Sequence, residues 1–262
     1  MFKNLFNKKP EKPLEIEHDW ASYFCRVEDK PASIRLNLAL NEIAPIEKYN
    51  HRIWFSIKLL DPDENGLSTK EEFPVICKIE DDISEALEKL GMILVGALKT
   101  NGTFDLYFYS KNTGEFEEVA NSVMKKHSNY SYAIDAKADN DWNDYFDFLY
   151  PGEYEYQTIL NQKVLINLET NGDNSESERE IDHWLYFETE KDRNSYIQKI
   201  EKIGYKVIST NILDKGKNAY QLNISKVSNA NRNTINDFVW ELIILSKEDN
   251  GTYDGWGCPI VK

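Results

Sequence analysis

The last third of the chain carries a strand, helix, strand, strand, helix, strand order that few folds accommodate. Alternating apolar residues predict a strand from Ile181, two strands over 205–213 and 219–227, and a last strand that ends at Gly257. Apolar residues at helical spacing predict a helix at each of the two remaining positions of this order. The second helix has one wide apolar stripe, formed by Ile235, Phe238, Val239, Leu242 and Ile243. This order is that of the ferredoxin-like fold, in which two helices cover one face of an antiparallel sheet.

The same order occurs earlier in the chain. Strand periodicity over 53–59 is followed by a helix that Ser68 and Glu71 would cap, and a hairpin turns at Asn101-Gly102. A second helix over 116–124 and a strand over 130–134 complete the order, and two extra strands, over 20–27 and 34–40, precede it. We therefore predict an α+β protein of two tandem ferredoxin-like (βαββαβ) units, the N-terminal unit having extra strands. Chance resemblance in so common an order is the alternative.

Polar segments divide the chain. We expect a flexible N-terminus over 1–13, an N-terminal α+β domain over 14–150, and a connecting helix and polar linker over 151–178. The ferredoxin-like domain then covers 179–262. The clearest linker, Glu169 to Glu178, is polar throughout and has no periodicity.

The chain is acidic, with 45 Asp and Glu residues against 31 Lys and Arg residues. Such a field disfavours direct nucleic-acid binding and favours a basic partner, although an acidic surface also simply keeps a protein soluble. Tyr107 and Tyr109 could line an open sheet face, as in one class of RNA-binding module, but the accompanying basic residues are missing. We expect no membrane association, and the widely spaced Cys25, Cys77 and Cys258 favour a reducing, cytoplasmic location.

Residues suited to catalysis are thinly spread. The histidines His18, His51, His127 and His183 are isolated in sequence, and no Gly-rich phosphate loop is present. We expect a protein that is not an enzyme and has no cofactor or metal. Two alternatives stay open: a self-associating scaffold, and a metal-dependent hydrolase that uses the acids around Asp141 to Asp147. The candidate acids are Asp139, Asp141, Asp144 and Asp147.

The terminal strand is the candidate partner-binding site. Strict alternation would put Tyr253, Gly255 and Gly257 on one face and Asp254, Trp256 and Cys258 on the other. Glycines in a strand mark close approach by another group, and Pro259 favours an edge position. We expect partner contact at Tyr253, Asp254, Gly255, Trp256 and Gly257. Trp256 is either an exposed anchor or a residue that fills the core of its own domain.

Two family resemblances follow from these residues. The C-terminal part, with Ile181-Asp182-His183-Trp184 and Tyr253-Asp254-Gly255-Trp256-Gly257, resembles the regulator of ribonuclease E activity B family. The N-terminal part, with Gly66-Leu67-Ser68-Thr69-Lys70-Glu71-Glu72 and Thr100-Asn101-Gly102, resembles the domain of unknown function 695. The first resemblance implies a non-catalytic protein that binds an RNA-degrading enzyme, a ribonuclease, and inhibits or modulates it.

One departure from that family concerns charge. Its members are strongly acidic, whereas residues 177–262 of this chain hold 12 Lys and Arg residues against 13 Asp and Glu residues. If acidity attracts the nuclease, this chain has lost that acidity or placed it elsewhere.

Overall fold

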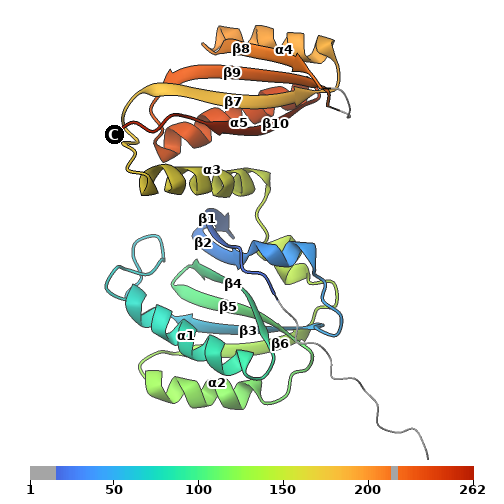
Figure 1. Ribbon diagram of the computed structural model, residues 1–262. Helices are drawn as coiled ribbons and strands as arrows, with labels where there is room; N and C mark the ends of the chain where they lie inside the picture. Colours follow the sequence, from blue (N-terminus) through green and yellow to red (C-terminus); the bar gives the residue numbers. More distant parts are fainter. Residues whose placement is uncertain (1–15, 214–217) are drawn as a thin grey trace, which may run out of the picture. The chain divides into compact units, whose positions relative to one another are not determined.

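The computed structural model describes residues 16–213 and 218–262, which form two compact units (Figure 1). The chain passes from the first unit to the second between Pro151 and Gly152. The expected flexible segment 1–13 and most of the turn expected at 214–218 lie outside the described residues. The helix expected between the units belongs to the second of them by its contacts. Among the described helices, none is long and apolar enough to cross a membrane.

The first unit contains an antiparallel sheet of six strands in the order β1-β2-β4-β5-β3-β6 (Figure 1). Four of its strands and two helices follow one another as β3-α1-β4-β5-α2-β6, the ferredoxin-like order, and β1 and β2 are the predicted extra strands. The strands are β1 (Trp20–Val27), β2 (Lys30–Asn37), β3 (His51–Lys58), β4 (Ile93–Thr100), β5 (Thr103–Ser110) and β6 (Tyr132–Ala138). The helices are α1 (Phe73–Glu88) and α2 (Phe116–Met124), with short 3-10 turns at Leu38–Glu42 and Lys125–His127.

The main core of this unit lies between the sheet and the two helices. Alternate residues of β3 and β5 point into it, among them Phe55, Leu106 and Phe108, and meet the apolar stripe of α1. The predicted start of α1 was wrong, because the helix begins at Phe73 and Ser68 does not cap it. Instead, the Glu72 carboxylate accepts the backbone N–H groups of Leu60 and Asp61, at 2.7 and 3.1 Å, and so ties the start of the helix to the preceding loop.

The opposite face of this sheet is covered by the segment from Trp142 to Tyr150, which includes the π-helix η3 (Asp144–Leu149). Trp142 is fully buried and stacks on Tyr109 with 3.9 Å between ring centroids. Its Nε1–H donates to the Tyr49 carbonyl oxygen at 2.7 Å. Tyr107 and Tyr109 are both buried, so they do not form the open aromatic face considered above.

The second unit contains a four-stranded antiparallel sheet in the order β10-β7-β9-β8. Counted within each unit, this arrangement matches that of β3 to β6, so both units have the predicted ferredoxin-like topology. The strands are β7 (Arg179–Phe187), β8 (Lys206–Ile212), β9 (Tyr220–Ser228) and β10 (Gly251–Gly257). The helices are α3 (Glu153–Thr170), α4 (Glu190–Lys202) and α5 (Arg232–Glu248). Thr189 caps α4 as predicted, since its side chain accepts the Asp192 N–H.

The polar segment between α3 and β7 is held to the body of its unit. Arg179 is buried and forms an ion pair with Asp173, whose Oδ1 also accepts the Val261 N–H at 2.8 Å. The Asn174 N–H donates to the Val261 carbonyl oxygen at 2.7 Å. The segment expected to be a linker therefore binds the last residues of the chain to this unit.

His183 is the fully buried polar residue at the centre of β7. Its Nδ1 lies 2.8 Å from the Tyr253 hydroxyl, and its ring packs edge-on against Tyr205. In the described part of the chain, His183 Nε2 has no hydrogen-bond partner. Burial, together with a smaller effect of the charge of nearby Lys226, lowers the pKa of His183 from 6.5 to about 3.

Gly251, at the start of β10, is a position where even a small side chain should destabilise the second unit. A Cβ atom there would come closest to Cε1 of Phe187 and lie 2.8 Å from its Cδ1, and this ring is fully buried in a close-packed core. We expect Gly251→Ala to lower the free energy of unfolding of this unit by about 1–3 kcal/mol. The matched control is Gly257→Ala in the same strand, whose Cβ would meet only the Trp184 ring at 3.6 Å. Urea unfolding of both variants is the measurement, and equal losses would contradict the clash.

His183 also predicts how stability changes with pH. Between pH 6.5 and about 3 the unfolded chain protonates this ring while the folded chain keeps it neutral, so the unfolded state binds more protons. The free energy of unfolding therefore falls on acidification through this window, by up to about 1.4 kcal/mol per pH unit from this residue. Urea unfolding followed on resolved NMR signals of β7 measures it. The stability difference between wild type and His183→Gln should shrink from pH 7 to pH 4, and a constant difference would contradict the assignment.

Candidate partner-binding surface

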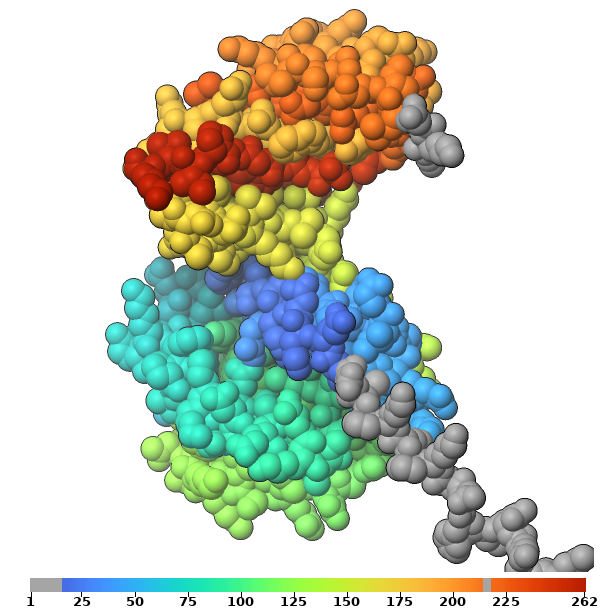
Figure 2. Space-filling model, viewed as in Figure 1, coloured from blue at the N-terminus to red at the C-terminus, as the bar shows by residue number. Residues whose placement is uncertain are grey.

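β10 lies at one edge of the second sheet and pairs only with β7 among the strands of the described chain. The glycines and the proline of this segment predicted that edge position. In Figure 2 the residues at the end of the chain, in red, form an exposed band of the second unit beside the yellow residues of α3. An edge strand with one neighbour keeps a row of backbone groups that its own sheet does not use.

A β-bulge interrupts the alternation of β10. Tyr253 lies opposite Leu185 and Gly255 lies opposite Trp184, so that Asp254 is the extra residue between them. The bulge reverses the face of every later residue. Tyr253 and Trp256 consequently both face the helices, and the expectation that they lie on opposite faces was wrong.

Trp256 belongs to the core of its own unit. Its side chain is 8% exposed and packs with apolar residues of α3 and α5, including Leu168, Val239 and Ile243. Its Nε1–H donates to Asn161 Oδ1 at 3.0 Å, and Asn161 Nδ2 donates to Asn236 Oδ1 at 2.9 Å. Of the two roles considered for this ring, the structure shows that it fills the core, where it joins α3 to the rest of the unit.

The other face of the sheet carries polar and aromatic side chains. All strand residues in the unit's core clusters come from the helix-facing side, while Trp184 and Tyr186 of β7 point away from it and are half-buried. The Tyr186 hydroxyl accepts Gln221 Nε2 at 2.9 Å. A Cβ at Gly257 would lie 3.6 Å from the Trp184 ring, so this ring lies over the position cleared by the glycine.

This face is also acidic near its aromatic rings. Glu180 and Asp182 alternate along β7 on the same side as Trp184, and the exposed Asp254 lies at the bulge of the neighbouring strand. Burial raises the pKa of Asp182, and the negative charge of Glu180 raises it further. Lys206 of β8, opposite Ser225, is the basic residue that the strand register places on this side. Such a surface suits a basic, partly apolar partner segment.

Sequence reasoning missed Trp184, Glu180 and Asp182 as surface residues of this site. The signal that could have found them was already present, because β7 alternates between large apolar residues and these polar or amphipathic residues. The structure brings Trp184 together with Gly255 and Gly257, whereas it separates them from Tyr253 and Trp256.

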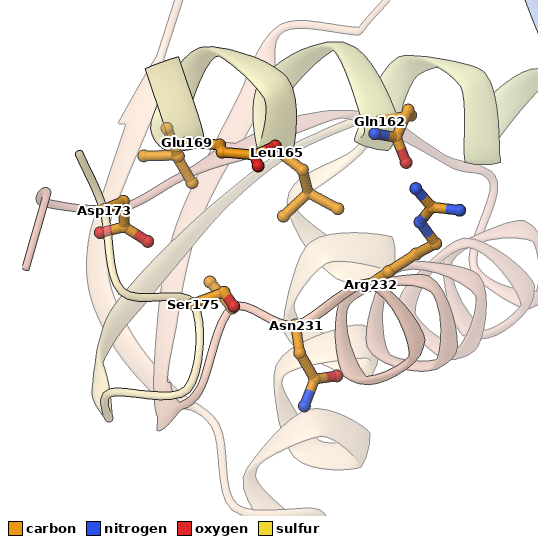
Figure 3. A pocket seen from close by; sticks show the side chains of 9 residues that line it. Gln162, Leu165, Glu169, Asp173, Ser175, Asn231 and Arg232 are labelled. Atoms are coloured by element: carbon orange, nitrogen blue, oxygen red, sulfur yellow. The ribbon is translucent and has the colours of Figure 1, made fainter. Parts of the chain in front are cut away.

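A hollow of the second unit, of about 300 Å³, lies between α3, the segment around Asp173 and the first turn of α5 (Figure 3). Leu165 of α3 points into it, and Gln162 and Arg232 lie near each other at one side. Two of the polar residues that line it already have partners within the unit. Asp173 binds Arg179, and the Asn231 side chain caps α5 by accepting the Thr234 N–H at 3.0 Å. The sheet face, whose aromatic and acidic side chains face away from the helices, is therefore the better candidate surface.

The acids of the alternative hydrolase site do not converge. Asp144 accepts from Arg52 Nε at 2.8 Å and from Lys137 Nζ at 2.6 Å, so cations occupy both of its carboxylate oxygens. Asp139 accepts the Tyr109 hydroxyl at 2.6 Å, while Asp141 and Asp147 are exposed. Across residues 16–213 and 218–262, no group of three or more His, Cys, Asp or Glu side chains is placed to hold a metal ion.

Comparison with known proteins agrees with the division into two units. Residues 18–150 match the model of a family of unknown function (DUF695), and residues 158–258 match the model of the family described as Regulator of ribonuclease activity B. No curated protein matches the chain. A crystal structure of an unknown protein from Galdieria sulphuraria is 10% identical, covers 80% of this chain and 99% of its own, and has a TM-score of 0.22.

The first match spans half of the chain and agrees with the boundaries of the first unit, and the second lies within the other unit. The protein therefore belongs to the family of unknown function DUF695, and residues 158–258 of its second unit are similar to the family described as Regulator of ribonuclease activity B.

Proposed function

We propose that this protein is a non-catalytic, cytoplasmic regulator whose second unit binds an RNA-degrading enzyme and modulates its activity. The observation that supports this proposal most directly is the match of residues 158–258 to the Regulator of ribonuclease activity B model. The acidic and aromatic sheet face agrees with a role in protein binding. The partner is a protein, and binding requires neither a cofactor nor direct contact with nucleic acid.

The proposed contact surface combines the outer side of β10 with its neighbour β7. Asp254, Gly255 and Gly257 supply the rim, and Trp184 supplies the large apolar area beside them. Aromatic side chains dominate the energetics of protein interfaces, and neighbouring glycines let a partner backbone approach the ring closely. Glu180 and Asp182 would pair with Lys or Arg residues of the partner.

Tyr253 and Trp256 have a different part in this proposal. Their side chains point to the helices, so they hold β10 in register and do not touch the partner directly. The bulge between them keeps Gly255 and Gly257 turned to the open face. Loss of either aromatic ring would weaken the fold of the second unit first and partner binding only as a consequence.

The proposal predicts that a substitution at Trp184 weakens partner binding, whereas a substitution at Trp256 lowers only the stability of the fold. The test begins with affinity purification from native cells and identification of the ribonuclease retained, followed by binding and RNA-cleavage assays with both purified proteins. We expect Trp184→Ser to weaken binding by about tenfold or more. Because the ring is half-buried, this variant should also lower the free energy of unfolding, by about 1–3 kcal/mol, and binding is compared under conditions where the second unit remains folded. Trp256→Phe, which loses the bond to Asn161, should lower stability by about 1–3 kcal/mol and leave the affinity of the folded protein unchanged.

Asp182 supplies the charge control for the same experiment. Because burial and Glu180 disfavour its ionised form, Asp182→Asn should be at least as stable as wild type and yet bind a basic partner less tightly. Retention of no ribonuclease, or no change in RNA cleavage on adding the purified protein, would overturn the proposed function. Equal affinity for wild type and Trp184→Ser would overturn the proposed surface alone.

A further inference from the structure

The first unit has an uncovered strip on the helix side of its sheet. α1 and α2 pack over the strands of the ferredoxin-like motif, whereas β1 and β2 extend the sheet beyond them. The strand register places Phe24 of β1 opposite Ser33 of β2, and Ser33 opposite Lys99 of β4. These three side chains therefore share the face on which α1 lies. In Figure 2 residues of β1 and β2, in blue, are at the surface beside turquoise residues of the following segments.

A cleft runs along this strip, between β1, β2 and the first turns of α1. It consists of two hollows, of about 320 and about 150 Å³, which share Ser33, Phe73 and Lys99 as lining residues. The larger hollow opens towards Phe24 and Ser68, and the smaller one ends at Cys77 and Glu80. Together they reach the size of sites that bind small molecules.

Lys99 is the most unusual residue of the cleft. Its ammonium group lies 4.5 Å from the centre of the Phe73 ring and 5.9 Å from that of Phe104. In the described residues it has no carboxylate partner, whereas the neighbouring cation, Arg35, forms an ion pair with Glu80. Burial lowers the pKa of Lys99; nearby Cys77 acts in the opposite direction, and the charge of Arg35 adds a smaller lowering. A half-buried cation without a counter-ion favours the entry of an anion.

The mouth of the cleft is apolar. Phe24 is 68% exposed and Phe73 is 47% exposed, so two large rings on facing elements are left to solvent. Ser33, Ser68 and Thr69 also line the larger hollow and bring hydroxyl groups to it, of which that of Thr69 already accepts the Glu72 N–H. The cleft thus combines a cation at its centre with aromatic surface at its opening.

We propose that this cleft binds a small amphipathic anion, whose carboxylate or similar acidic group pairs with Lys99 and whose apolar part lies between Phe24 and Phe73. The Ser33 hydroxyl, which lies opposite Lys99 on the adjacent strand, is placed to donate a second hydrogen bond to the acidic group. The first unit is then a ligand-binding domain, independent of the sheet face of the second unit. Ligand charge and ligand apolar area both contribute to affinity.

A charge series with one apolar body tests the proposal on the full chain. The probes are 4-phenylbutyrate, 4-phenylbutanol and 4-phenylbutylamine, each followed by amide NMR shifts of the first unit. We expect 4-phenylbutyrate to shift signals at Ser33, Phe73 and Lys99, the alcohol to bind more weakly, and the amine not to bind. Affinity for the anion should also fall on the alkaline side at a pH below the ordinary lysine pKa of 10.5, because only the ammonium form pairs with it.

Variants identify the groups that contribute. Lys99→Met keeps the length of the side chain and removes its charge, and we expect at least about tenfold weaker binding of 4-phenylbutyrate. Phe24→Ser changes an exposed side chain, so it should fold normally and weaken binding of both the anion and the alcohol. The control is Lys125→Met, which removes an exposed lysine outside the cleft. Absence of shifts up to about 10 mM probe, equal binding by Lys99→Met, or equal binding of the alcohol and the anion would each overturn the proposal.

Discussion

The extra residue in β10 determines which way each side chain of the terminal strand points. Without the bulge at Asp254, Trp256 would leave the helix side and α3 would lose the hydrogen bond and packing that attach it to the unit. With the bulge, one short strand supplies core residues to one face and glycine-lined backbone to the other. A single insertion therefore joins α3 to its domain and also opens the sheet face beside Trp184.

The two units share one topology and differ in which side of the sheet is covered. In the first, the segment from Trp142 to Tyr150 packs on the face away from the helices and buries Tyr107 and Tyr109. In the second, the corresponding face carries Trp184, Tyr186 and their amide and carboxylate neighbours. The added strands of the first unit instead leave room on the helix side. Similar backbones thus offer surfaces of different chemistry, as expected when binding sites depend on side chains more than on topology.

Periodicity and turn residues were sufficient to predict the order of elements, both ferredoxin-like units and the edge position of β10. These patterns gave wrong predictions where an irregularity in the backbone interrupted the alternation of side chains along a strand. The bulge at Asp254 shifts Trp256 by one face, and nothing in the alternation of Tyr253 to Gly257 marks the extra residue. The start of α1 failed for a related reason, since Glu72 binds the preceding loop through long-range contacts that a local capping pattern does not include. The strip beside Lys99 depends on pairing between strands distant in sequence, so a local pattern does not reveal it.

The charge of the second unit is better understood by position than by sum. Residues 177–262 are nearly balanced, but several of their cations are turned inward. Arg179 is buried against Asp173, Arg193 is buried with its guanidinium near the Asn211 and Gln221 carbonyls, and Lys226 lies over the rings of Tyr205 and Phe238 on the helix side. Glu180 and Asp182 point the other way, to the face of Trp184. Because these three cations are buried or face the helices, and Lys206 is the basic residue that the register places beside Glu180 and Asp182, a domain with almost no net charge still presents an acidic patch. The proposed attraction of a basic partner therefore does not require an acidic tail.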